Sequence, residues 1–483
     1  MPRTMLHFVD TGQQAPDKRP AAERIGDFGE IQRDFEAAPA QRQAGRCSQC
    51  GIPFCQSKCP LHNNIPDWLK LAAEDRLAEA YEMAQATNSF PEICGRICPQ
   101  DRLCEGACVI EPGFGTVTIG AIERHIVESA FQAGLVKPPR PLRELDKSVG
   151  IIGAGPGGLA AAEALRRSGL GVTVYDRHDR IGGLLVYGIP AFKLEKSVVA
   201  RRAALLTEAG VEFRMNFALG VDASLDEIRD RHDAVLIATG VYRGRRLGGI
   251  GGGLEGIVPA LDYLIASNRK GLGDAVPEFD DGGLNAAARH VVVIGGGDTA
   301  MDCVRTAVRQ RARSVTCLYR RDRDNMPGSA NEVRHAEQEG VRFCWLAAPE
   351  ALLGDGRVSA VRAHRMRLGA ADGDGRQQVV PVAGSTFTLD ADLVIEALGF
   401  DPEDIPTLFG APELQITPAG TISVDPHTMM TNLEGVFAAG DIVRGASLVV
   451  WAIRDGRAAA EAIGDFVLAE NLPRPAAAPE WQR

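Results

Sequence analysis

The sequence predicts an α/β chain with a helical, cysteine-rich region at its front, and three observations support this fold class. Eight of the eleven cysteines fall between Cys47 and Cys108. A buried strand, a glycine-rich turn and a helix follow one another over residues 148–165, and the same succession returns over residues 290–308. A chain of 483 residues is too long for one hydrophobic core, so we expect several domains.

Composition narrows the classes of function. Hydrophobic residues make up 45% of the chain and charged residues 24%, as in ordinary globular proteins. The net charge of −10 disfavours a nucleic-acid or membrane-surface partner. No apolar window reaches the roughly 18 residues of a membrane span, and residues 1–10 lack the apolar core of a secretion signal. We therefore expect a cytoplasmic protein whose reduced thiols bind metal or do redox work.

The clustered cysteines form two runs. The first reads C-x2-C-x4-C-x3-C-P from Cys47 to Pro60, and the second reads C-x3-C-P-x4-C-x3-C from Cys94 to Cys108. Residues 65–84 repeat apolar side chains at helical intervals, so we expect helices between the runs. Iron–sulfur clusters need thiolate ligands, four for each [4Fe–4S] cubane. Eight cysteines therefore fit two [4Fe–4S] clusters. Two zinc sites are the alternative, although zinc usually takes separated C-x2-C pairs.

The cysteines that precede prolines predict that the two clusters share the runs. In bacterial two-cluster ferredoxins the cysteine before proline binds the other cluster. The first cluster would then be bound by Cys47, Cys50, Cys55 and Cys108, and the second by Cys59, Cys94, Cys98 and Cys104. Glu123, on the next predicted helix, is an alternative to Cys94 as the fourth ligand of the second cluster. We expect Cys303, Cys317 and Cys344 to be core thiols, in a helix and two strands.

The first glycine-rich turn has the pattern of a dinucleotide site. Gly153, Gly155 and Gly158 form G-x-G-x-x-G between a strand and a helix. Such glycines let the backbone approach a pyrophosphate, which the first N–H groups of the helix would bind. Asp176 ends the next strand, 23 residues after Gly153, where a carboxylate holds ribose hydroxyls. The alternative is a glycine-rich turn without a ligand.

Later segments give this first site the features of a flavin site. The glycine pair at residues 182–183 lets a flat ring lie close to the backbone. Asp441, after a strand, suits a hydrogen bond with a ribityl chain, and the helix that starts near Ser447 would direct its positive end at the isoalloxazine. The Ala-Thr-Gly end of a further strand, at residues 238–240, belongs to the same predicted site. The predicted FAD-binding residues are Gly153, Gly155, Gly158, Asp176, Gly182, Gly183, Leu184, Thr239, Gly240, Gly440, Asp441, Ser447 and Leu448.

The second glycine-rich turn predicts a second nucleotide, NADPH. The strand after this turn ends in Arg320-Arg321 where the first site has an acid. An arginine there accommodates a 2′-phosphate, which a carboxylate would repel, so we expect NADPH in preference to NADH. The alternative is a solvated charge cluster that includes Asp322. The predicted NADPH-binding residues are Gly295, Gly297, Asp298, Thr299, Arg320, Arg321 and Gly399. Between strands, residues 354–390 alternate apolar and polar side chains and predict a small antiparallel sheet.

The order of the two nucleotide motifs, one nested in the other, resembles the glutathione and thioredoxin reductases. Those enzymes carry a redox-active C-x4-C or C-x2-C pair beside the flavin. Neither residues 182–186 nor the segment around Cys303 has such a pair. We therefore expect that the chain is not a disulfide reductase and that its electrons leave through the two cysteine runs.

From residues 46–51 through residues 91–99 to residues 440–446, the chain closely resembles the small (β) subunit family of bacterial NADPH-dependent glutamate synthases. It also resembles the N-terminal part of dihydropyrimidine dehydrogenase, in which a glutamine near the position of Glu123 is a cluster ligand. The resemblance implies a helical two-[4Fe–4S] domain followed by two Rossmann-like, three-layer ββα dinucleotide-binding domains, with the NADPH domain inserted in the FAD domain. We place the iron–sulfur domain at residues 1–145, the FAD domain at 146–285 and 405–472, the NADPH domain at 286–404 and a tail at 473–483.

The resemblance also implies a route for electrons. NADPH would reduce FAD, and electrons would pass singly through both clusters to a large (α) partner subunit. That subunit would carry FMN and a further iron–sulfur cluster and make L-glutamate from 2-oxoglutarate and glutamine. No side chain needs to act as nucleophile or base, so we predict no catalytic residue. The alternatives are an NADPH-oxidising subunit that serves a pyrimidine reductase or another acceptor, and a non-catalytic redox sensor or cluster scaffold.

Overall fold

The computed structural model describes residues 6–250, 253–371, 373 and 377–469. The predicted tail at residues 473–483 lies outside this range. Contacts divide the chain into two compact units, each built from three stretches of sequence. One unit comprises Met1–Val136, Gly182–Ala200 and Tyr242–Asp401, and the other comprises Lys137–Ile181, Arg201–Val241 and Pro402–Arg483. None of the helices in the described ranges combines the length and the apolar character that crossing a membrane requires.

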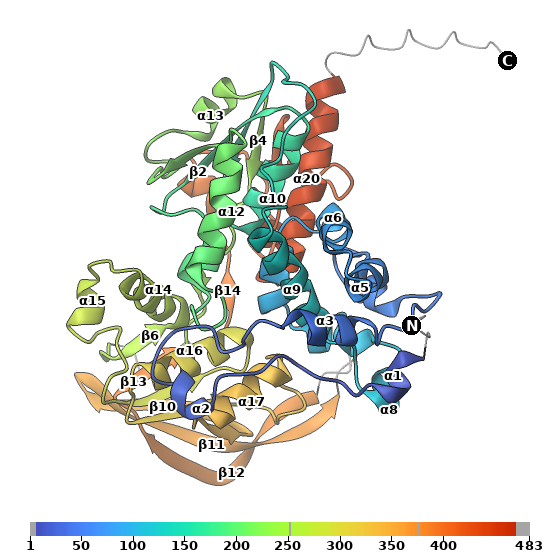
Figure 1. The fold of residues 1–483 in the computed structure, drawn as a ribbon. Coiled ribbons are helices and arrows are strands. Elements are labelled where there is room, and N and C mark those ends of the chain that lie inside the picture. The colour runs from blue at the N-terminus through green and yellow to red at the C-terminus, as the bar shows by residue number, and fades with distance from the viewer. Residues whose placement is uncertain (1–5, 251–252, 372, 374–376, 470–483) are drawn as a thin grey trace, which may run out of the picture. The chain divides into compact units, whose positions relative to one another are not determined.

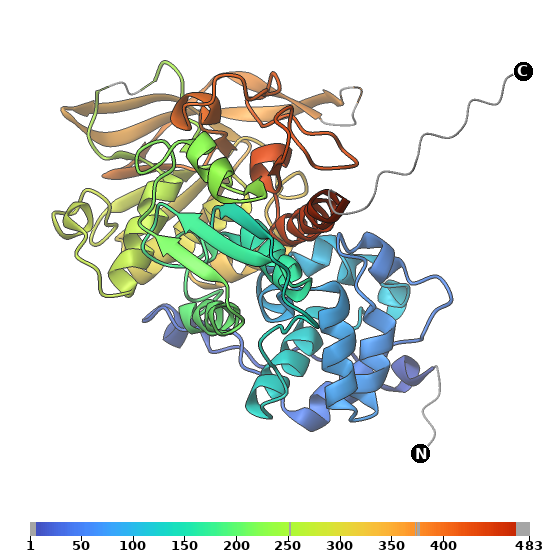
Figure 2. The same cartoon turned by 90° about the horizontal axis from the view of Figure 1, so that it is seen from above.

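The second unit is built on a parallel five-stranded sheet (Figures 1 and 2). Its strand order is β15-β4-β1-β2-β3, and every neighbouring pair is parallel. The strands are β1 (Ser148–Ile152), β2 (Gly171–Asp176), β3 (Glu212–Met215), β4 (Ala234–Ile237) and β15 (Val436–Ala438). All four residues of β4 are buried, as expected for a parallel strand that is covered on both faces.

The same unit contains two long helices that pack against each other, α10 (Pro156–Arg167) and α20 (Val449–Ala469). They approach so closely that a Cβ atom on Gly456 would lie 2.1 Å from the carbonyl oxygen of Gly157. Glycine at both positions therefore permits the crossing. A hydrophobic core cluster of this unit includes Ile152, Val235 and residues of α13 (Leu225–Arg231), α18 (Ile405–Leu408) and α19 (Asp441–Arg444).

The first unit begins with helices that surround the cysteine runs. Trp68 is completely buried among them. The helices between the runs are α5 and α6, which confirms the expectation from residues 65–84. The helical elements of this region are α1 (His7–Asp10), α2 (Ala21–Arg24), α3 (Ala37–Ala44), α4 (Phe54–Lys58), α5 (Ile65–Ala73), α6 (Leu77–Thr87), α7 (Pro91–Ile97), two 3-10 turns (Gln100–Arg102 and Glu105–Ala107), α8 (Glu111–Phe114) and α9 (Ile119–Gln132).

The same unit contains a second parallel five-stranded sheet, in the order β6-β13-β7-β8-β9. Its strands are β6 (Ile257–Pro259), β7 (His290–Ile294), β8 (Ser314–Tyr319), β9 (Arg342–Trp345) and β13 (Leu393–Glu396), and the helices that accompany them are α14 (Ala260–Gly271), α15 (Pro277–Asp280), α16 (Asp298–Arg309) and α17 (Ala330–Gln338). The predicted antiparallel sheet is present as β10 (Ala347–Asp355), β11 (Arg357–Ala371) and β12 (Gln377–Asp390).

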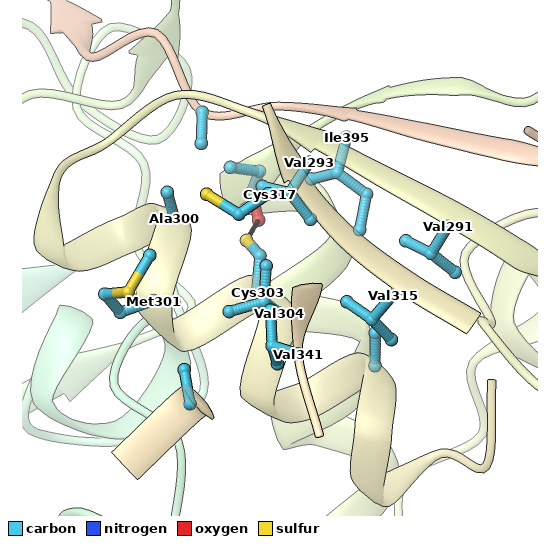
Figure 3. Close-up of a cluster of buried hydrophobic side chains, with 14 of the residues drawn as sticks. Val291, Val293, Ala300, Met301, Cys303, Val304, Val315, Cys317, Val341 and Ile395 are labelled. Atoms are coloured by element: carbon cyan, nitrogen blue, oxygen red, sulfur yellow. Dashed lines mark hydrogen bonds between the residues drawn. The ribbon is translucent and has the colours of Figure 1, made fainter. Parts of the chain in front are cut away.

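Alternating side chains of β7 show that this sheet is the middle of three layers. Val291 and Val293 join the core beneath α14, α16 and α17, whereas Val292 and Ile294 join the core beneath β10 and β11. The expected three-layer ββα arrangement is therefore confirmed for this domain. Figure 3 shows Cys303 and Cys317 inside the helical core. Both are fully buried, and Cys344 packs beside the other core, so the three thiols are core residues as predicted.

Some segments that lie next to the nucleotide motifs in sequence belong to the first unit. The stretch Gly182–Ala200 contains α11 (Leu184–Tyr187) and the start of α12 (Lys196–Glu208). Strand β6 lies in the second sheet, although the sequence analysis places residues 257–259 in the first part of the FAD domain. Near the return of the chain, β5 (Arg243–Gly244) and β14 (Phe400–Asp401) form a two-stranded antiparallel ribbon.

Candidate functional site

Four thiols of the helical region line one pocket. They are Cys47, Cys50, Cys55 and Cys108, which is the set predicted for the first cluster. Apolar side chains complete the wall, among them those of Phe54, Leu69, Val117 and Ile119. In the described ranges, no three His, Cys, Asp or Glu side chains converge on a point that a single metal ion could occupy. The thiols surround a space instead, and four thiols around an apolar space are the donor set that a [4Fe–4S] cubane takes.

The environment of this pocket opposes free thiolates. Burial is the largest cause that raises the pKa of Cys47 to about 11 and that of Cys55 to about 12, and the charges of neighbouring cysteines contribute to both increases. Thiolates collected at this point therefore need a positively charged partner. A metal centre supplies that charge, since metals bind cysteine in its deprotonated form.

Arg46 links the segment before the first cysteine run to the segment after the second, a role that the sequence did not predict. Its side chain is fully buried, and its Nε donates to the carbonyl oxygen of Thr11 at 2.9 Å. Its Nη2 donates to the carbonyl oxygens of Phe114 (2.6 Å) and Gly115 (2.9 Å). Arg46 precedes Cys47, and Phe114 follows Cys108, so this buried cation ties the first cysteine run to the end of the second. The only signal in the sequence was its place beside Cys47.

The side chains predicted for the second cluster also interact with one another. Cys98 shares a hydrogen bond with Cys94, which is the largest cause of its raised pKa, and burial and the charge of Glu123 add to it. Burial is the main cause that raises the pKa of Cys59 to about 11 and that of Cys104 well above its usual range, with Glu123 contributing to both. The structure therefore brings Cys59, Cys98 and Cys104 within the electrostatic reach of Glu123.

Glu123 is itself an unusual buried acid. Its Oε1 accepts hydrogen bonds from Asn88 Nδ2 at 3.1 Å and Asn63 Nδ2 at 3.5 Å. Burial raises the pKa of Glu123 to about 8. The Cys94 thiol interacts with the other polar atom of the same amide group, because it donates to Asn88 Oδ1 at 3.8 Å. Both candidates for the fourth ligand are thus buried in the same polar cluster, and Asn88 touches each of them.

The first glycine turn, in the second unit, has the geometry of a phosphate cradle. Gly153 has a φ of +114°, and a Cβ there would lie 2.4 Å from the carbonyl oxygen of Ala238, so only glycine fits. A Cβ on Gly155 would meet nothing within 4 Å, which leaves open space above the turn. Helix α10 begins at Pro156, so its free N–H groups face that space. Asp176 Oδ2 accepts a hydrogen bond from the N–H of Ala154 at 2.7 Å, which ties the acid at the end of β2 to the turn.

Other residues predicted for FAD gather at the carboxyl ends of strands in this unit. Thr239, after β4, has a buried Oγ1 that has no hydrogen-bond partner. Asp441 follows β15, and burial is the main cause that raises its pKa to about 6. A buried hydroxyl without a partner and a poorly solvated acid are what a polar ligand chain would satisfy. Ser447 and Leu448 precede α20 directly.

The glycine pair Gly182–Gly183 lies in the stretch that belongs to the first unit. The pair directly precedes the short helix α11, and Lys196 binds this helix and a residue that follows it. The Nζ of Lys196 donates to the carbonyl oxygens of Leu185, at 3.1 Å, and Ile189. Burial lowers the pKa of Lys196 to about 7. This lysine was not predicted, because nothing in the local sequence pattern distinguishes it from a surface residue.

The second glycine turn repeats the geometry of the first. Gly295 has a φ of +145°, and a Cβ there would lie 2.2 Å from the carbonyl oxygen of Ala397, just as Gly153 meets Ala238. A Cβ on Gly297 would meet nothing within 4 Å. Helix α16 then begins at Asp298. The two turns therefore offer the same open cradle before a helix of twelve residues.

The arginine pair after β8 is available to a ligand at this second turn. Arg320 is exposed. Arg321 donates through Nη2 to the carbonyl oxygen of Gln377 at 3.4 Å, and its buried Nε has no hydrogen-bond partner. Arg323, two residues further, is already paired with Glu337 at 2.9 Å. Arginine donors without acid partners are what a phosphate group requires.

Two known families match successive parts of the chain. Residues 24–135 match the family described as dihydropyrimidine dehydrogenase domain II, 4Fe–4S cluster. Residues 147–456 match the family described as pyridine nucleotide-disulphide oxidoreductase. Among solved structures, FprA of Mycobacterium tuberculosis in complex with NADPH has a TM-score of 0.57 and 19% identity, over 69% of this chain and 86% of that one. This likeness shows the two-domain α/β fold.

Curated relatives match almost the whole chain. The glutamate synthase (NADPH) small chain of Azospirillum brasilense is 64% identical over 467 residues, which cover 96% of this chain and 97% of the relative. The protein of that name from Escherichia coli is 45% identical, over 97% of this chain and all of the relative. The putative oxidoreductase AegA of Escherichia coli is 46% identical over 94% of this chain, but only 69% of that longer protein is matched.

Proposed function

This chain belongs to the family of NADPH-dependent glutamate synthase small chains, and from that premise we propose that it is the electron-entry subunit of a glutamate synthase. It is an NADPH-dependent oxidoreductase of the pyridine nucleotide-disulphide oxidoreductase fold, with FAD, NADPH and [4Fe–4S] clusters as cofactors. The observation that carries the proposal is the pocket lined by Cys47, Cys50, Cys55 and Cys108 in a chain that also has two dinucleotide turns. Those three sites are what a two-electron to one-electron converter needs.

The second unit would hold FAD. The open cradle at Gly155 and the start of α10 would bind its pyrophosphate, and Asp176 would bind its adenine ribose. Asp441 and the unpartnered Oγ1 of Thr239 would serve the rest of the flavin chain. Gly240, Gly440, Ser447 and Leu448 complete this set in the second unit.

The second turn would hold NADPH. Gly295, Gly297, Asp298 and Thr299 form the cradle and the start of α16, and Gly399 directly precedes β14. Arg320 and Arg321 would bind the 2′-phosphate, which supports NADPH as the donor in preference to NADH.

The cofactors supply the electron chemistry when bound: a hydride leaves NADPH for FAD, and the clusters accept electrons one at a time. This chain's residues bind and orient. The thiols of Cys47, Cys50, Cys55 and Cys108 would hold the first cluster in an apolar wall that limits water. Those of Cys59, Cys98 and Cys104 would hold the second, with Cys94 or Glu123 as the fourth ligand. We assign no side chain a role as nucleophile or general base.

Between the two candidates for the fourth ligand, the surroundings of Glu123 give it the stronger support. Glu123 is among the causes that raise the pKa values of Cys59, Cys98 and Cys104, the three other proposed ligands. Two asparagine amides also orient its carboxyl group by hydrogen bonds. A carboxyl group oriented in this way is ready to bind a metal without rearrangement.

The partner would be a large glutamate synthase subunit that carries FMN and a further iron–sulfur cluster. In that complex the electrons would reduce the condensation product of 2-oxoglutarate and ammonia from glutamine. The names and nearly full-length coverage of the relatives support this partner. The likeness to AegA supports the second candidate, in which the same module feeds a different acceptor.

The decisive experiment is affinity purification of the tagged chain from its own cells, followed by flavin, iron and sulfide analysis. We expect a copurifying large subunit, one FAD per small chain and NADPH-dependent glutamate formation from 2-oxoglutarate and glutamine. In a second assay, NADPH should bleach the flavin band of the isolated chain and reduce a one-electron dye. An FAD-loaded chain that NADPH leaves oxidised would overturn the electron-entry function. A reducible chain that captures a different acceptor would favour the AegA-like alternative.

A further inference from the structure

A loop of the iron–sulfur domain holds the second glycine turn. This loop, residues 99–103, lies between two of the proposed cluster ligands, Cys98 and Cys104. Arg102 Nη2 lies 2.9 Å from Asp298 Oδ2, at the first residue of α16, and Arg102 Nη1 donates to the carbonyl oxygen of Pro327. Both residues belong to the same compact unit.

A third segment, residues 327–330, completes the junction. The N–H of Gly328 donates to the carbonyl oxygen of Gly296 at 2.9 Å, and the N–H of Ser329 donates to Asp298 Oδ1 at 2.9 Å. From the other side, Asp101 accepts hydrogen bonds from Ser329 Oγ at 3.2 Å and from the N–H of Ala330 at 3.0 Å. The glycine turn, residues 327–330 and the ligand loop therefore fix one another.

The charge of Asp298 makes this junction matter for a nucleotide. A carboxylate at the start of α16 offsets the positive end of the helix, where a pyrophosphate would bind. Arg102 faces that carboxylate with a positive charge, and Ser329 occupies its second oxygen. The side chains of Arg102 and Asp298 are 39% and 34% exposed, so a ligand can reach the pair. One turn further along α16, Asp302 already has its own cation, Lys193, at 2.9 Å.

We propose that Arg102 is a positioning residue for NADPH, supplied by the iron–sulfur domain. It neutralises Asp298 and holds the glycine turn in the shape that a pyrophosphate needs. Because Arg102 lies between Cys98 and Cys104, the affinity for the nucleotide depends on the order of the loop that binds the second cluster. This inference rests on the proposed function and adds to it a link between two sites that belong to different domains.

The test measures the dissociation constant of NADP⁺, which allows no turnover, by isothermal titration calorimetry on the oxidised holoprotein. We expect Arg102→Ala to raise the constant about tenfold, and Arg102→Lys, which keeps the charge, to raise it by about threefold or less. The matched control is Arg76→Ala. Arg76 belongs to the same helical region and is 47% exposed, but its partners Glu74 and Glu79 are its own neighbours in sequence. We expect the control to match the wild type within about twofold.

Measuring the effect of Arg102→Ala in a second variant, Asp298→Asn, distinguishes the positioning role of Arg102 from general structural damage. In Asp298→Asn, the negative charge that Arg102 offsets is absent, so Arg102→Ala should cost about threefold or less there. Iron content is measured for every variant, and Arg102→Lys and Arg102→Gln replace Arg102→Ala if that variant loses iron. An unchanged constant in Arg102→Ala, or the same loss in both backgrounds, would overturn the inference. A wild-type protein that fails to bind NADP⁺ would instead overturn the proposed function.

Discussion

The guanidinium of Arg305 and the carboxylate of Glu339 form two hydrogen bonds, of 3.0 Å and 2.9 Å, and both side chains are completely buried. Arg309 binds the same carboxylate at 2.7 Å. The Nε of Arg24, from the N-terminal arm, lies 2.8 Å from it. Glu339 thus joins α2, α16 and the end of α17. Burial opposes its charge, but the hydrogen bonds from Arg309 and Arg305 prevail and lower its pKa to about 2.

Replacing this acid should destabilise the first unit in a way that depends on pH. At pH 7, Glu339→Gln should reduce the free energy of unfolding by about 3 kcal/mol, because it leaves buried arginines without a counter-charge. The folded pKa lies below the unfolded value of about 4.3. The stabilisation by Glu339 is therefore complete above that value and declines as the pH falls toward 2. Denaturant midpoints of the wild type and the variant at pH 7, 5 and 3.5 measure this.

The difference between wild type and Glu339→Gln should be constant from pH 7 to 5 and smaller at 3.5. Comparing two proteins at each pH removes effects of acid that they share. Glu79→Gln, whose partner Arg76 is on the surface, serves as the control and should leave the midpoint unchanged. If the difference were the same at pH 3.5, the arginine partners would not lower the pKa of Glu339.

Single cysteine substitutions should remove one cluster and spare the other. Cys108→Ser should lower the iron content from about eight to about four atoms per chain, because it opens the pocket of Cys47, Cys50 and Cys55. Cys59→Ser should give the same iron content but lose the other cluster. Electron paramagnetic resonance of the reduced proteins distinguishes the two remaining signals. Cys344→Ser, in a core of the nucleotide domain, should keep all the iron. Identical remaining signals in Cys108→Ser and Cys59→Ser would contradict the crossing of ligands between runs.

The fourth ligand of the second cluster can be identified by two substitutions of neighbouring side chains. We expect Glu123→Ala to reduce the iron content to about four atoms per chain, because its carboxyl group acts on three of the other proposed ligands. We expect Cys94→Ala to retain about eight, with a shifted spectrum, since Cys94 shares Asn88 with Glu123. Glu123→Gln should keep the cluster, because an amide oxygen can replace the carboxylate. Loss of iron in Cys94→Ala alone would make Cys94 the ligand.

The choice of nicotinamide cofactor should depend on Arg320. In Arg320→Ala, the KM for NADPH should rise about tenfold while the KM for NADH changes by less than about twofold, because only NADPH has the 2′-phosphate. Dye reduction by the isolated chain, with each donor varied, gives both constants. Arg323→Ala is the matched control, since Arg323 is paired with Glu337. Equal losses with both donors would place Arg320 outside the 2′-phosphate site.

Much of the architecture follows from local pattern. The two glycine turns were predictable because each combines a buried strand, glycines and a helix start, and the structure gives Gly153 and Gly295 the same close contact with a neighbouring strand. The first cysteine set was predictable from spacing and the prolines, since both constrain which thiols meet. Arg46, Lys196 and Arg102 were not predictable. Their side chains contact backbone carbonyl oxygens or residues far away in sequence, and no periodic pattern in the sequence predicts such contacts.

The pairing of β4 with β15 sets an order for folding during synthesis. Strand β4 ends at Ile237, but its neighbour β15 begins only at Val436, and α20 follows it. The sheet of the second unit therefore stays incomplete until residues 436–438 have left the ribosome, whereas the sheet of the first unit is complete at Glu396. Because domains fold as their sequences emerge, the iron–sulfur and NADPH regions precede the flavin domain. A truncation just before α20 would leave the earlier unit able to fold and the flavin unit without its closing helix.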